Sequence, residues 1–403
     1  MRTEQRLEHD LEVHLPRLAG IRRRPQLLRH PLYQRLEPEI ERVVQGLEWR
    51  LDVPRQPEVR PFVRAVAWNI ERGKRYGGIC ELLRHHEILR EADLLLLTEV
   101  DIGMGRSGGR NVARELASTL GYAYVYANGY LQLAPGDKDE AQHPWPAGLS
   151  LHGTALLSRF PVTRCEGVVL PEFRDRFHSF EKRLGDKRAL VAEVQLPDGP
   201  LTVAVVHTDP FAPPRHRALQ VERVLTVVER FGHERVLFGG DLNTNTYDLG
   251  SPLRLVLDAL QKGVSLGWHG TIAEYMTPWR IFERPVFAAL EEHGLSIEGV
   301  NDLSQGTLYY DVNDQMQHDK SRDFVPGPVL SYLRRKLEPW DGRVPMRIDW
   351  FAGRGLRPAP GYLPGTDLAA MTLVRPTWPL GGEGGERLSD HDPIVVDLAL
   401  APH

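Results

Sequence analysis

The sequence has little cysteine: Cys80 and Cys165 are the only two in 403 residues. Two cysteines are too few for the disulfide framework that stabilises many secreted proteins. The first residues, MRTEQRLEHDLEVHLPRL, also lack the apolar stretch of a secretory signal. Both absences predict a cytoplasmic protein whose thiols stay reduced.

Long apolar runs and a large net charge are missing as well. No run approaches the roughly 18 apolar residues that a membrane helix needs, so no transmembrane segment is expected. The 50 Lys and Arg residues nearly balance the 54 Asp and Glu residues, which leaves a net charge of −4. No overall positive field therefore draws the chain to nucleic acid or anionic lipid, although local charge or a bound metal could do so.

Two regions differ in composition. Residues 1–59 are rich in Arg, Glu and Leu, and the run LEPEIERVVQGLEWR at 36–50 has apolar residues at helical spacing. This pattern predicts a helical N-terminal extension that ends in a proline-bearing linker at 52–61. From residue 60 onwards, short β-branched runs alternate with helical patterns, which is typical of an α/β domain.

The domain at 60–403 has enough regular segments for a large sheet structure. Helices are predicted at 79–90, 112–120, 215–230 and 253–261. Residues 250–345 are less regular and read as an insertion, either the wall of a pocket or plain scaffold. Strands are predicted at 63–68, 94–98, 122–126, 154–157, 190–196, 201–206, 235–238, 347–351 and 394–398.

Polar residues follow several of these apolar strands directly, which places a site at the rim of a sheet. Oxygen donors at such a rim suit a hard cation such as Mg²⁺. Neither a His-x₃-His nor a Cys-x₂-Cys pair occurs, so a structural zinc site is not expected. Taken alone, each segment could be an ordinary turn without a function, because Asp and Asn also favour turns. The rim residues are Asn69, Glu71, Glu99, His207, Asp241, Asn243, Asp349, Asp390 and His391.

Taken together and in this order, the segments resemble the endonuclease/exonuclease/phosphatase superfamily. That superfamily includes pancreatic-type deoxyribonucleases, apurinic endonucleases, sphingomyelinases and inositol polyphosphate phosphatases. DIGMGRSG at 101–108 and GLSLHG at 148–153 resemble a bacterial branch of it. The matching segments are WNIE at 68–71, LTE at 97–99, LLSRFP at 156–161, VHT at 206–208, GDLN at 240–243, RID at 347–349 and SDHDP at 389–393.

The resemblance implies a fold and a set of roles. The fold is a four-layer α/β/β/α sandwich of two facing mixed sheets with outer helices; the strand pattern alone leaves a doubly wound sheet open. Glu99 would be the principal metal ligand, with Asn69, Glu71 and Asp390 beside it. Asp241 and Asn243 would activate and orient the attacking water. His391, held by Asp349, would stabilise the charge of the transition state, and His207 would contact a second phosphate oxygen.

Some features depart from the family pattern. About a hundred residues separate Asn243 from Asp349, more than a compact member needs. The strand before His207 ends Val-Val-His-Thr rather than the usual Asn-Thr-His-Leu. Arg106 and His152 lie in glycine-bearing loops, where they are either substrate-binding residues or ordinary loop residues.

The sequence therefore predicts metal-dependent hydrolysis of a phosphate ester by in-line attack of an activated water, with Mg²⁺, or Mn²⁺ in its place. A catalytically silent binding module on the same scaffold is the alternative. The substrate stays open between a nucleic acid, a lipid headgroup and a small phosphate ester. For a nuclease, Trp279-Arg280, Arg334-Arg335 and Trp340 could supply stacking and phosphate contacts.

Overall fold

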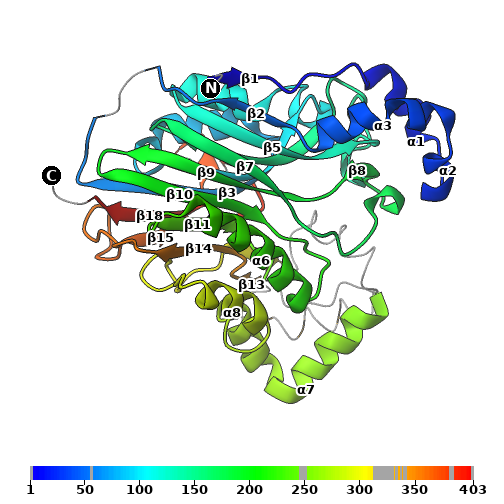
Figure 1. Cartoon of the computed structure of the whole chain (residues 1–403). Coiled ribbons are helices and arrows are strands. Elements are labelled where there is room, and N and C mark those ends of the chain that lie inside the picture. Colours follow the sequence, from blue (N-terminus) through cyan, green and yellow to red (C-terminus); the bar gives the residue numbers. More distant parts are fainter. Residues whose placement is uncertain are drawn as a thin grey trace.

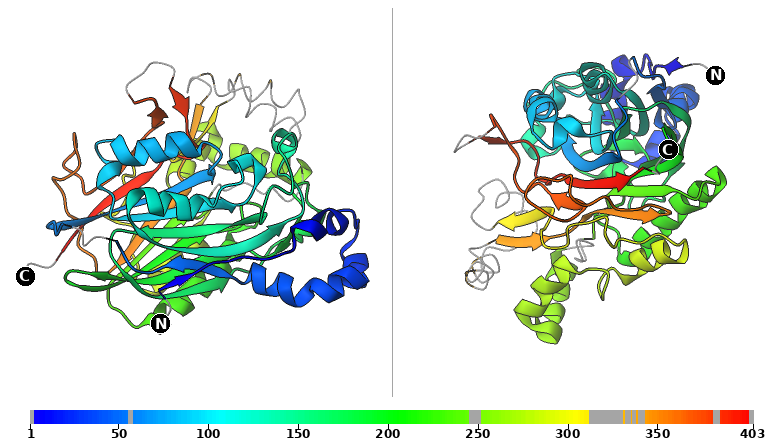
Figure 2. Two further views of the ribbon diagram at one scale, coloured as in Figure 1. Left: turned by 90° about the horizontal axis from the view of Figure 1, so that it is seen from above. Right: turned by 90° about the vertical axis from the view of Figure 1, so that its left-hand side faces the viewer.

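Two β-sheets face each other in the computed structural model, and helices cover both outer sides (Figures 1 and 2). The structure describes residues 3–54, 58–244, 252–311, 343–380 and 385–400, together with Ser331, Arg335 and Glu338. Both sheets are mixed, since β3 and β4 pair in parallel in one and β10 and β11 in the other. The predicted four-layer sandwich is confirmed, and the doubly wound sheet is excluded.

Among the described residues, the larger sheet has nine strands and the smaller sheet five. The larger sheet runs β1 (Glu4–Gln5), β2 (Leu47–Arg50), β5 (Ala123–Gln132), β6 (Leu151–Ser158), β4 (Leu94–Ile102), β3 (Phe62–Arg72), β18 (Ile394–Ala399) and β15 (Ala370–Thr372), with β8 (Arg183–Gly185) beside β5. The smaller sheet runs β14 (Asp349–Arg354), β11 (Val236–Asp241), β10 (Gly199–His207), β9 (Arg188–Leu196) and β7 (Val162–Val169). Two short pairs are β12 (Leu308–Asp311) with β13 (Arg343–Met346), and β16 (Thr377–Trp378) with β17 (Glu386–Arg387).

Helices pack on each outer face through separate apolar clusters. Helices α4 and α5 cover the larger sheet, and α6 and α8 cover the smaller one. Helix α7 extends away from the sandwich (Figure 1), and no helix in the described ranges combines the length and apolarity needed to cross a bilayer. The helices are α1 (Leu15–Ala19), α2 (Arg24–Leu28), α3 (Pro31–Val44), α4 (Tyr76–His85), α5 (Val112–Leu120), α6 (Pro214–Phe231), α7 (Pro252–Met276) and α8 (Arg284–Glu292).

Strand alternation decides which side chains fill the gap between the sheets. In β3, Val63, Ala65 and Ala67 face the smaller sheet, whereas Val66 and Trp68 face the helices. Successive side chains of a strand point to opposite faces, so the odd-numbered residues of β3 line the gap. The same alternation brings apolar residues of β9, β10, β11 and β14 into the gap from the other side. Polar residues that continue these rows at the strand ends therefore lie at the mouth of the gap.

Most predicted elements are confirmed, although most of their bounds differ from the predicted ones; β3 and β5, for example, end four and six residues later than predicted. Helix α4 ends at His85 rather than 90, because His86 is extended and its ring accepts a hydrogen bond from Ile88 N at 3.2 Å. Strand β14 starts at Asp349 rather than 347. Helix α7 continues to Met276, well past the predicted end at 261, and includes a kink at Gly267.

The N-terminal extension is helical over α1 to α3 but also contributes to the larger sheet. Strand β2 pairs antiparallel with β5, with Trp49 opposite Val125. The predicted helical run at 36–50 therefore ends as a strand. A division of the chain near residue 59 stays a prediction. So does the insertion at 250–345, of which residues 250 and 251 and most of 312–342 fall outside the described residues.

Candidate active site

Three neighbouring strands of the smaller sheet bring three predicted site residues side by side. Strands β10 and β11 are parallel with His207 opposite Asp241, and β14 is antiparallel to β11 with Asp349 opposite Asp241. All three residues continue rows that fill the gap between the sheets. A side chain at Gly240 would clash, since its Cβ would lie 2.2 Å from Val206 O, which explains the glycine before Asp241.

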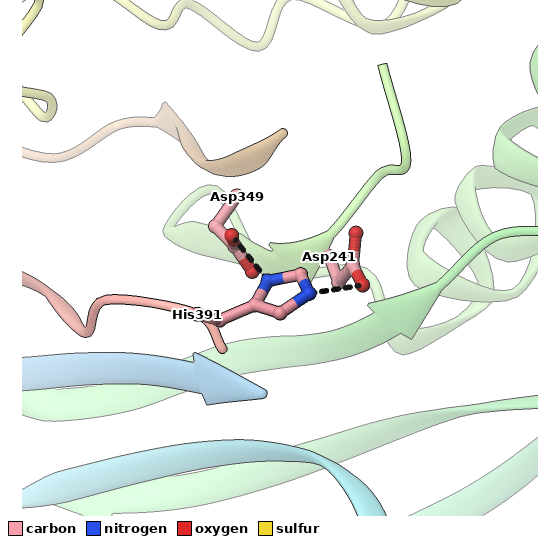
Figure 3. A group of neighbouring side chains, drawn as sticks. All are labelled: Asp241, Asp349 and His391. Carbon is pink, nitrogen blue, oxygen red and sulfur yellow. Dashed lines mark hydrogen bonds and ion pairs between the residues drawn. The ribbon is translucent and has the colours of Figure 1, made fainter. Parts of the chain in front are cut away.

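His391 links two of these carboxylates (Figure 3). Its Nδ1 lies 2.9 Å from Asp349 Oδ2, and its Nε2 lies 3.9 Å from Asp241 Oδ2. The backbone of His391 is fixed from both sides: Trp68 Nε1 donates to its carbonyl at 3.0 Å, and its N–H donates to Ser389 Oγ at 3.1 Å. The imidazole is therefore held in one orientation between two acids.

Asn69 and His207 complete the surroundings of Asp241. Asn69 Nδ2 donates to Asp241 Oδ2 at 3.1 Å, and His207 Nε2 lies 3.4 Å from the same oxygen. The other oxygen, Oδ1, accepts the backbone N–H of Asn243 at 2.9 Å. Asn69 comes from β3 of the larger sheet, so the site joins the two sheets across the gap.

Burial and neighbouring charges shift the pKa values of this group in different directions. Burial and the nearby Asp349 raise the pKa of Asp241 to about 7, although His391 opposes the shift. Burial alone would lower the pKa of His391, but Asp349 and Asp241 outweigh it and hold that pKa well above 6.5. Burial and the positive charge of Lys187 hold the pKa of His207 well below 6.5. The two histidines therefore differ: the neighbouring carboxylates favour the cationic form of His391, whereas burial and Lys187 favour the neutral form of His207.

Glu99 lies at a bulge in β4, where the pairing with β6 shifts register between Leu97 and Val100. Its backbone is left-handed, with φ of 52°, a strain of about 1–3 kcal/mol that concentrates at functional sites. Its nearest cation is Arg72, with Nε 3.6 Å from Glu99 Oε2. Burial alone would raise the pKa of Glu99, but Arg72 and the histidines at 207, 152 and 391 outweigh it and lower that pKa.

Three other predicted residues lie at the same rim with different partners. Glu71 accepts from Lys74 Nζ and Arg75, both at 3.1 Å, so its carboxylate is already neutralised. Asp390 is adjacent to His391, and Ser389 Oγ lies 3.5 Å from its Oδ1. Asn243 has a left-handed backbone with φ of 46°, and its Nδ2 donates to the carbonyl that follows His207, at 3.0 Å.

Arg106 does not reach solvent. Its side chain is 0% exposed, and its guanidinium binds Asp101 through two nitrogens, at 2.7 and 3.0 Å. The same guanidinium donates to Glu140 at 2.9 Å and to Glu181 at 2.6 Å. A direct contact between Arg106 and substrate has no support in this geometry.

His152 is linked to Arg106 through the carboxylate of Asp101. Strands β4 and β6 place Asp101 opposite His152, and His152 Nδ1 lies 2.8 Å from Asp101 Oδ1. His152 also affects the pKa values of Glu99 and His207, so its ring lies near both of them. Asp101 and His152 thus form a second hydrogen-bonded acid–histidine pair, which Arg106 holds in place, in addition to the pair of Asp349 and His391.

Sequence reasoning missed Asp101, Arg72, Glu140 and Glu181. Arg72 bridges the site and the buried cluster, since it contacts Glu99, Asp137 at 3.1 Å and Glu140. Asp101 opens the segment DIGMGRSG and could have been found there. Glu140 and Glu181 lie in irregular segments without any local signal.

The residues fit a divalent metal in two places. Ligand atoms of Asp241, Asp349 and His391 lie within 4.8 Å of one another. Both ring nitrogens of His391 already face carboxylates, however, so these three favour proton transfer over metal binding. Glu99 differs, because its carboxylate accepts no hydrogen bond from the described residues and Arg72 lies beyond hydrogen-bond distance. Carboxylate and amide oxygens at 99 and 69 are the donors that Mg²⁺ prefers.

The aromatic and basic residues considered for nucleic-acid contacts are only partly described. Trp279 packs edge-on against Trp350 and Phe287, with ring centroids 5.5 and 6.2 Å apart. It is half-buried and packs against the apolar cluster beneath α8, and its role in stacking stays a prediction. Arg334 and Trp340 lie outside the described residues.

A sandwich with an acid–histidine centre at its strand ends defines a class of phosphoester-cleaving folds, and the sequence identifies the family. Residues 66–288, more than half of the chain, match the Endonuclease/Exonuclease/phosphatase family. The chain belongs to this family. Its members are typically hydrolases of phosphoester bonds, so membership supports phosphoester hydrolysis in general. No curated protein matches the sequence.

Solved structures of related proteins superpose loosely. An endonuclease/exonuclease/phosphatase from Beutenbergia cavernae is 17% identical, with a TM-score of 0.44 over 85% of this chain and 72% of that one. A 3′ phosphatase from Neisseria bound to a product DNA hairpin is 16% identical, with a TM-score of 0.43 over 83% and 99%. The 2′,3′-cyclic phosphatase ANGEL2 is 15% identical, with a TM-score of 0.45 over 84% and 95%.

Proposed function

We propose that this chain is a Mg²⁺-dependent phosphoesterase, which hydrolyses a phosphate ester by in-line attack of an activated water. The observation that carries the proposal is the group of Asp349, His391, Asp241 and Asn69, joined by polar contacts of 2.9, 3.9 and 3.1 Å where the two sheets meet. Such a group can hold a water, take its proton and stabilise the charge of a phosphoryl transition state. Mn²⁺ is the natural substitute for Mg²⁺ at oxygen donors.

Asp241 positions and deprotonates the water. Its Oδ1 is fixed by the backbone of Asn243, and its Oδ2 is directed towards Asn69, His207 and His391. A carboxylate held in this way presents one oxygen to the nucleophile at a defined angle. The side chain of Asn243 fixes the loop after His207 and thereby orients the water indirectly.

His391 and His207 contact the phosphate. His391 is cationic and oriented by Asp349, so it stabilises the negative charge that grows on the phosphoryl oxygens. His207 is neutral and donates a hydrogen bond to a second oxygen. Losing one such donor commonly costs on the order of 10²–10³ in rate.

Glu99 and Asn69 would hold the metal ion, together with Asp390 and Glu71. A bound Mg²⁺ would act as a Lewis acid on a phosphate oxygen. Glu99 has a left-handed backbone, and its carboxylate interacts electrostatically with Arg72 and with the histidines at 207, 152 and 391. His152 also faces this side, while Arg106 acts as a positioning residue that holds Asp101 against His152.

The substrate is a phosphate ester, and a nucleic acid is one candidate among several. The net charge of −4 favours a small or single-stranded substrate over long duplex DNA. The two free cysteines support a cytoplasmic location for the reaction.

The test is hydrolysis of bis(p-nitrophenyl) phosphate, p-nitrophenyl phosphate, plasmid DNA and a single-stranded oligonucleotide, each with Mg²⁺, Mn²⁺ or chelator. Asp241→Asn and His391→Ala should each lower kcat by a factor of 10² or more. The matched control is His233→Ala, because His233 also pairs with a carboxylate, Glu193, at 2.5 Å but lies before the start of β11. It should leave turnover unchanged.

Metal-dependent turnover that both site variants abolish and the control retains would support the proposal. If no substrate turns over, titration of Mn²⁺ against wild-type protein and Glu99→Gln separates two cases. Mn²⁺ binding that the variant loses would indicate an enzyme of narrow specificity. Absence of Mn²⁺ binding would favour the silent binding module.

A further inference from the structure

The N-terminal extension carries a concentration of positive charge that the reaction described so far does not use. Residues 13–36 contain six arginines and neither an aspartate nor a glutamate, although the whole chain has a net charge of −4. Solvated helical faces usually mix charges of both signs, whereas a block of one positive sign is typical of a segment that contacts a polyanion. This block covers α1, α2 and the start of α3.

The arginines of this block lie on the surface, while the leucines between them are buried. Leu15, Leu18 and Leu27 belong to the apolar cluster on the outer side of the larger sheet. Within the described part of the chain, Arg24 is the one arginine of the six with an ion-pair partner, since its Nη1 lies 3.0 Å from Asp175 Oδ1. The exposed arginines are Arg17, Arg22, Arg23, Arg29 and Arg35.

Direct contacts connect the basic block with the candidate active site. Lys182 Nζ donates to the carbonyl of Ala19 at 2.8 Å. The preceding residue, Glu181, has a carboxylate oxygen 3.8 Å from Arg72 Nη2, and Arg72 Nε lies 3.6 Å from Glu99 Oε2. Figure 1 shows α1 to α3 beside β8, the strand that follows Lys182 directly. The block therefore lies next to the rim at which Glu99 is placed.

The composition of the block fits the phosphodiester backbone of a nucleic acid better than an anionic bilayer. All its cations are arginines, whose planar guanidinium group can bind two phosphate oxygens at once. A helix that lies on a membrane needs a continuous apolar face. Helices α1 and α2 have only five residues each, and the large apolar side chains that the block exposes are those of Val13 and Leu28.

We propose that the arginine surface, made of Arg17, Arg22, Arg23 and Arg29, binds the phosphate backbone of a single-stranded nucleic acid whose scissile ester lies in the candidate active site. This inference rests on the proposed function and assigns its substrate class. Contacts to phosphates hold the strand without reading its bases, so the surface supplies affinity rather than sequence specificity. Local charge beside the site thus attracts a polyanion to a chain whose net charge is negative.

The test measures binding of a fluorescein-labelled single-stranded oligothymidylate by fluorescence anisotropy, in chelator and over a series of salt concentrations. The surface variant replaces all four arginines of the arginine surface with glutamine, which keeps a polar side chain and a good helix propensity. The control variant replaces four other exposed arginines with glutamine, so that both variants lose the same charge. The control positions are Arg84, Arg90, Arg223 and Arg357.

The surface variant should bind the oligonucleotide more weakly by about tenfold or more at low salt. Each phosphate contact contributes about 0.7 to the slope of log K against log salt, so the loss of four contacts should make the slope shallower by about 3. The control variant should keep the affinity and the slope of wild type. Both variants should hydrolyse bis(p-nitrophenyl) phosphate as wild type does and keep its Tm, because the replaced side chains are exposed and lie outside the reacting group.

Three results would overturn the inference. The first is wild-type protein that does not bind the oligonucleotide, or a surface variant that binds it equally well. The second is an equal loss of affinity in the control variant, which would reduce the effect to overall charge. The third is sedimentation with phosphatidylserine vesicles that depends on the four arginines while oligonucleotide binding does not, which would make a bilayer the partner.

Failure of the proposed function has a different signature. Oligonucleotide binding that depends on the arginine surface, with no ester hydrolysed, would retain the surface and remove the reaction. Metal-dependent cleavage of the oligonucleotide by a surface variant with unchanged affinity would retain the reaction and remove the surface.

Discussion

The imidazole of His391 depends on Asp349 for its orientation, and Asp349 and Asp241 together favour its cationic form. Asp349 fixes the ring through Nδ1, and Asp241 lies opposite Nε2. The second carboxylate oxygen of Asp349 is fully buried and has no partner in the described structure. That oxygen costs free energy in the folded state, which indicates that Asp349 is present for the histidine rather than for stability.

Asp349→Asn should therefore lower kcat with little change in KM. Asparagine can donate a hydrogen bond to Nδ1 and so favours the wrong tautomer of the ring. In comparable acid–histidine pairs the loss is on the order of 10⁴. Steady-state kinetics on the substrate found above measures it, and Glu193→Gln, at the His233 pair, should have no effect. Equal losses in both variants would contradict the assignment.

We expect Arg106 to stabilise the folded protein by pairing with three carboxylates rather than to bind substrate. Arg106→Met leaves Asp101, Glu140 and Glu181 without their shared cation, so the free energy of unfolding should fall by about 3–5 kcal/mol. Urea denaturation measures this change. Arg84→Met is the control: it breaks an exposed pair with Glu81 at 2.9 Å and should cost less than about 1 kcal/mol. A variant with normal stability and raised KM would instead show a substrate contact.

At the scale of elements, the bulge in β4 explains why Glu99 accepts no hydrogen bond from the described residues, although Arg72 lies 3.6 Å away. The bulge after Leu97 turns Glu99 out of the ladder. Glu71, in the left-handed segment at the end of β3, is instead bound by Lys74 and Arg75. The two glutamates predicted to bind the same metal ion therefore differ in their cationic neighbours: Arg72 lies 3.6 Å from Glu99, whereas Lys74 and Arg75 both bind Glu71.

Glu99→Gln should weaken Mn²⁺ binding far more than Glu71→Gln. The expected loss is at least tenfold for Glu99 and less than threefold for Glu71, because the Glu71 carboxylate is already neutralised by two cations. Calorimetric titration of Mn²⁺ measures both. The two variants keep side-chain length and backbone geometry, so each serves as the control for the other. The reverse order would make Glu71 the principal ligand.

The extension and the main sheet also depend on each other. Strand β2 covers the edge of β5, and Leu15, Leu18 and Leu27 belong to the apolar cluster beneath α4 and α5. A protein that starts at residue 60 should expose this surface and an unpaired strand edge. We expect it to aggregate or to unfold at a lower temperature, as measured by size-exclusion chromatography and thermal melting. A monomer with unchanged Tm would support an independent domain.

Across the whole molecule, the buried charge cluster beside the site links stability to pH. Burial alone would raise the pKa of Glu140, but Arg72 and Arg106 outweigh it and lower that pKa to about 2. Glu181 is lowered by the same two arginines. Because these pKa values lie below the value of about 4.3 for an unfolded chain, the stabilisation is complete above about pH 5.

The free energy of unfolding should therefore fall as the pH drops from about 5 towards 2, while the carboxylates of Glu140 and Glu181 become protonated. Urea denaturation at a series of pH values measures the profile. Glu140→Gln removes one of the titrating groups and should make the profile shallower below pH 5. An identical slope in that variant would show that other carboxylates dominate.

The sequence predicted the strands and the rim residues, because an apolar run followed directly by polar residues can be recognised in a segment of about ten residues. They could not predict the surroundings of those residues. Lys187 comes from a turn without periodicity, and Glu140 and Glu181 meet Arg106 only in the folded chain. The left-handed backbone at Glu99 has no sequence signal either, since glycine is absent there. The neighbours that orient a site are set by long-range packing.

Asn69 and His391 are 322 positions apart, yet they meet because β18 inserts beside β3. A polypeptide emerging from the ribosome has Asn69, Glu71 and Glu99 long before it has Asp349, Asp390 and His391. Until the segment that leads into β18 has been translated and paired, the candidate site is incomplete. The order of synthesis thus delays the proposed hydrolysis until the sandwich has closed.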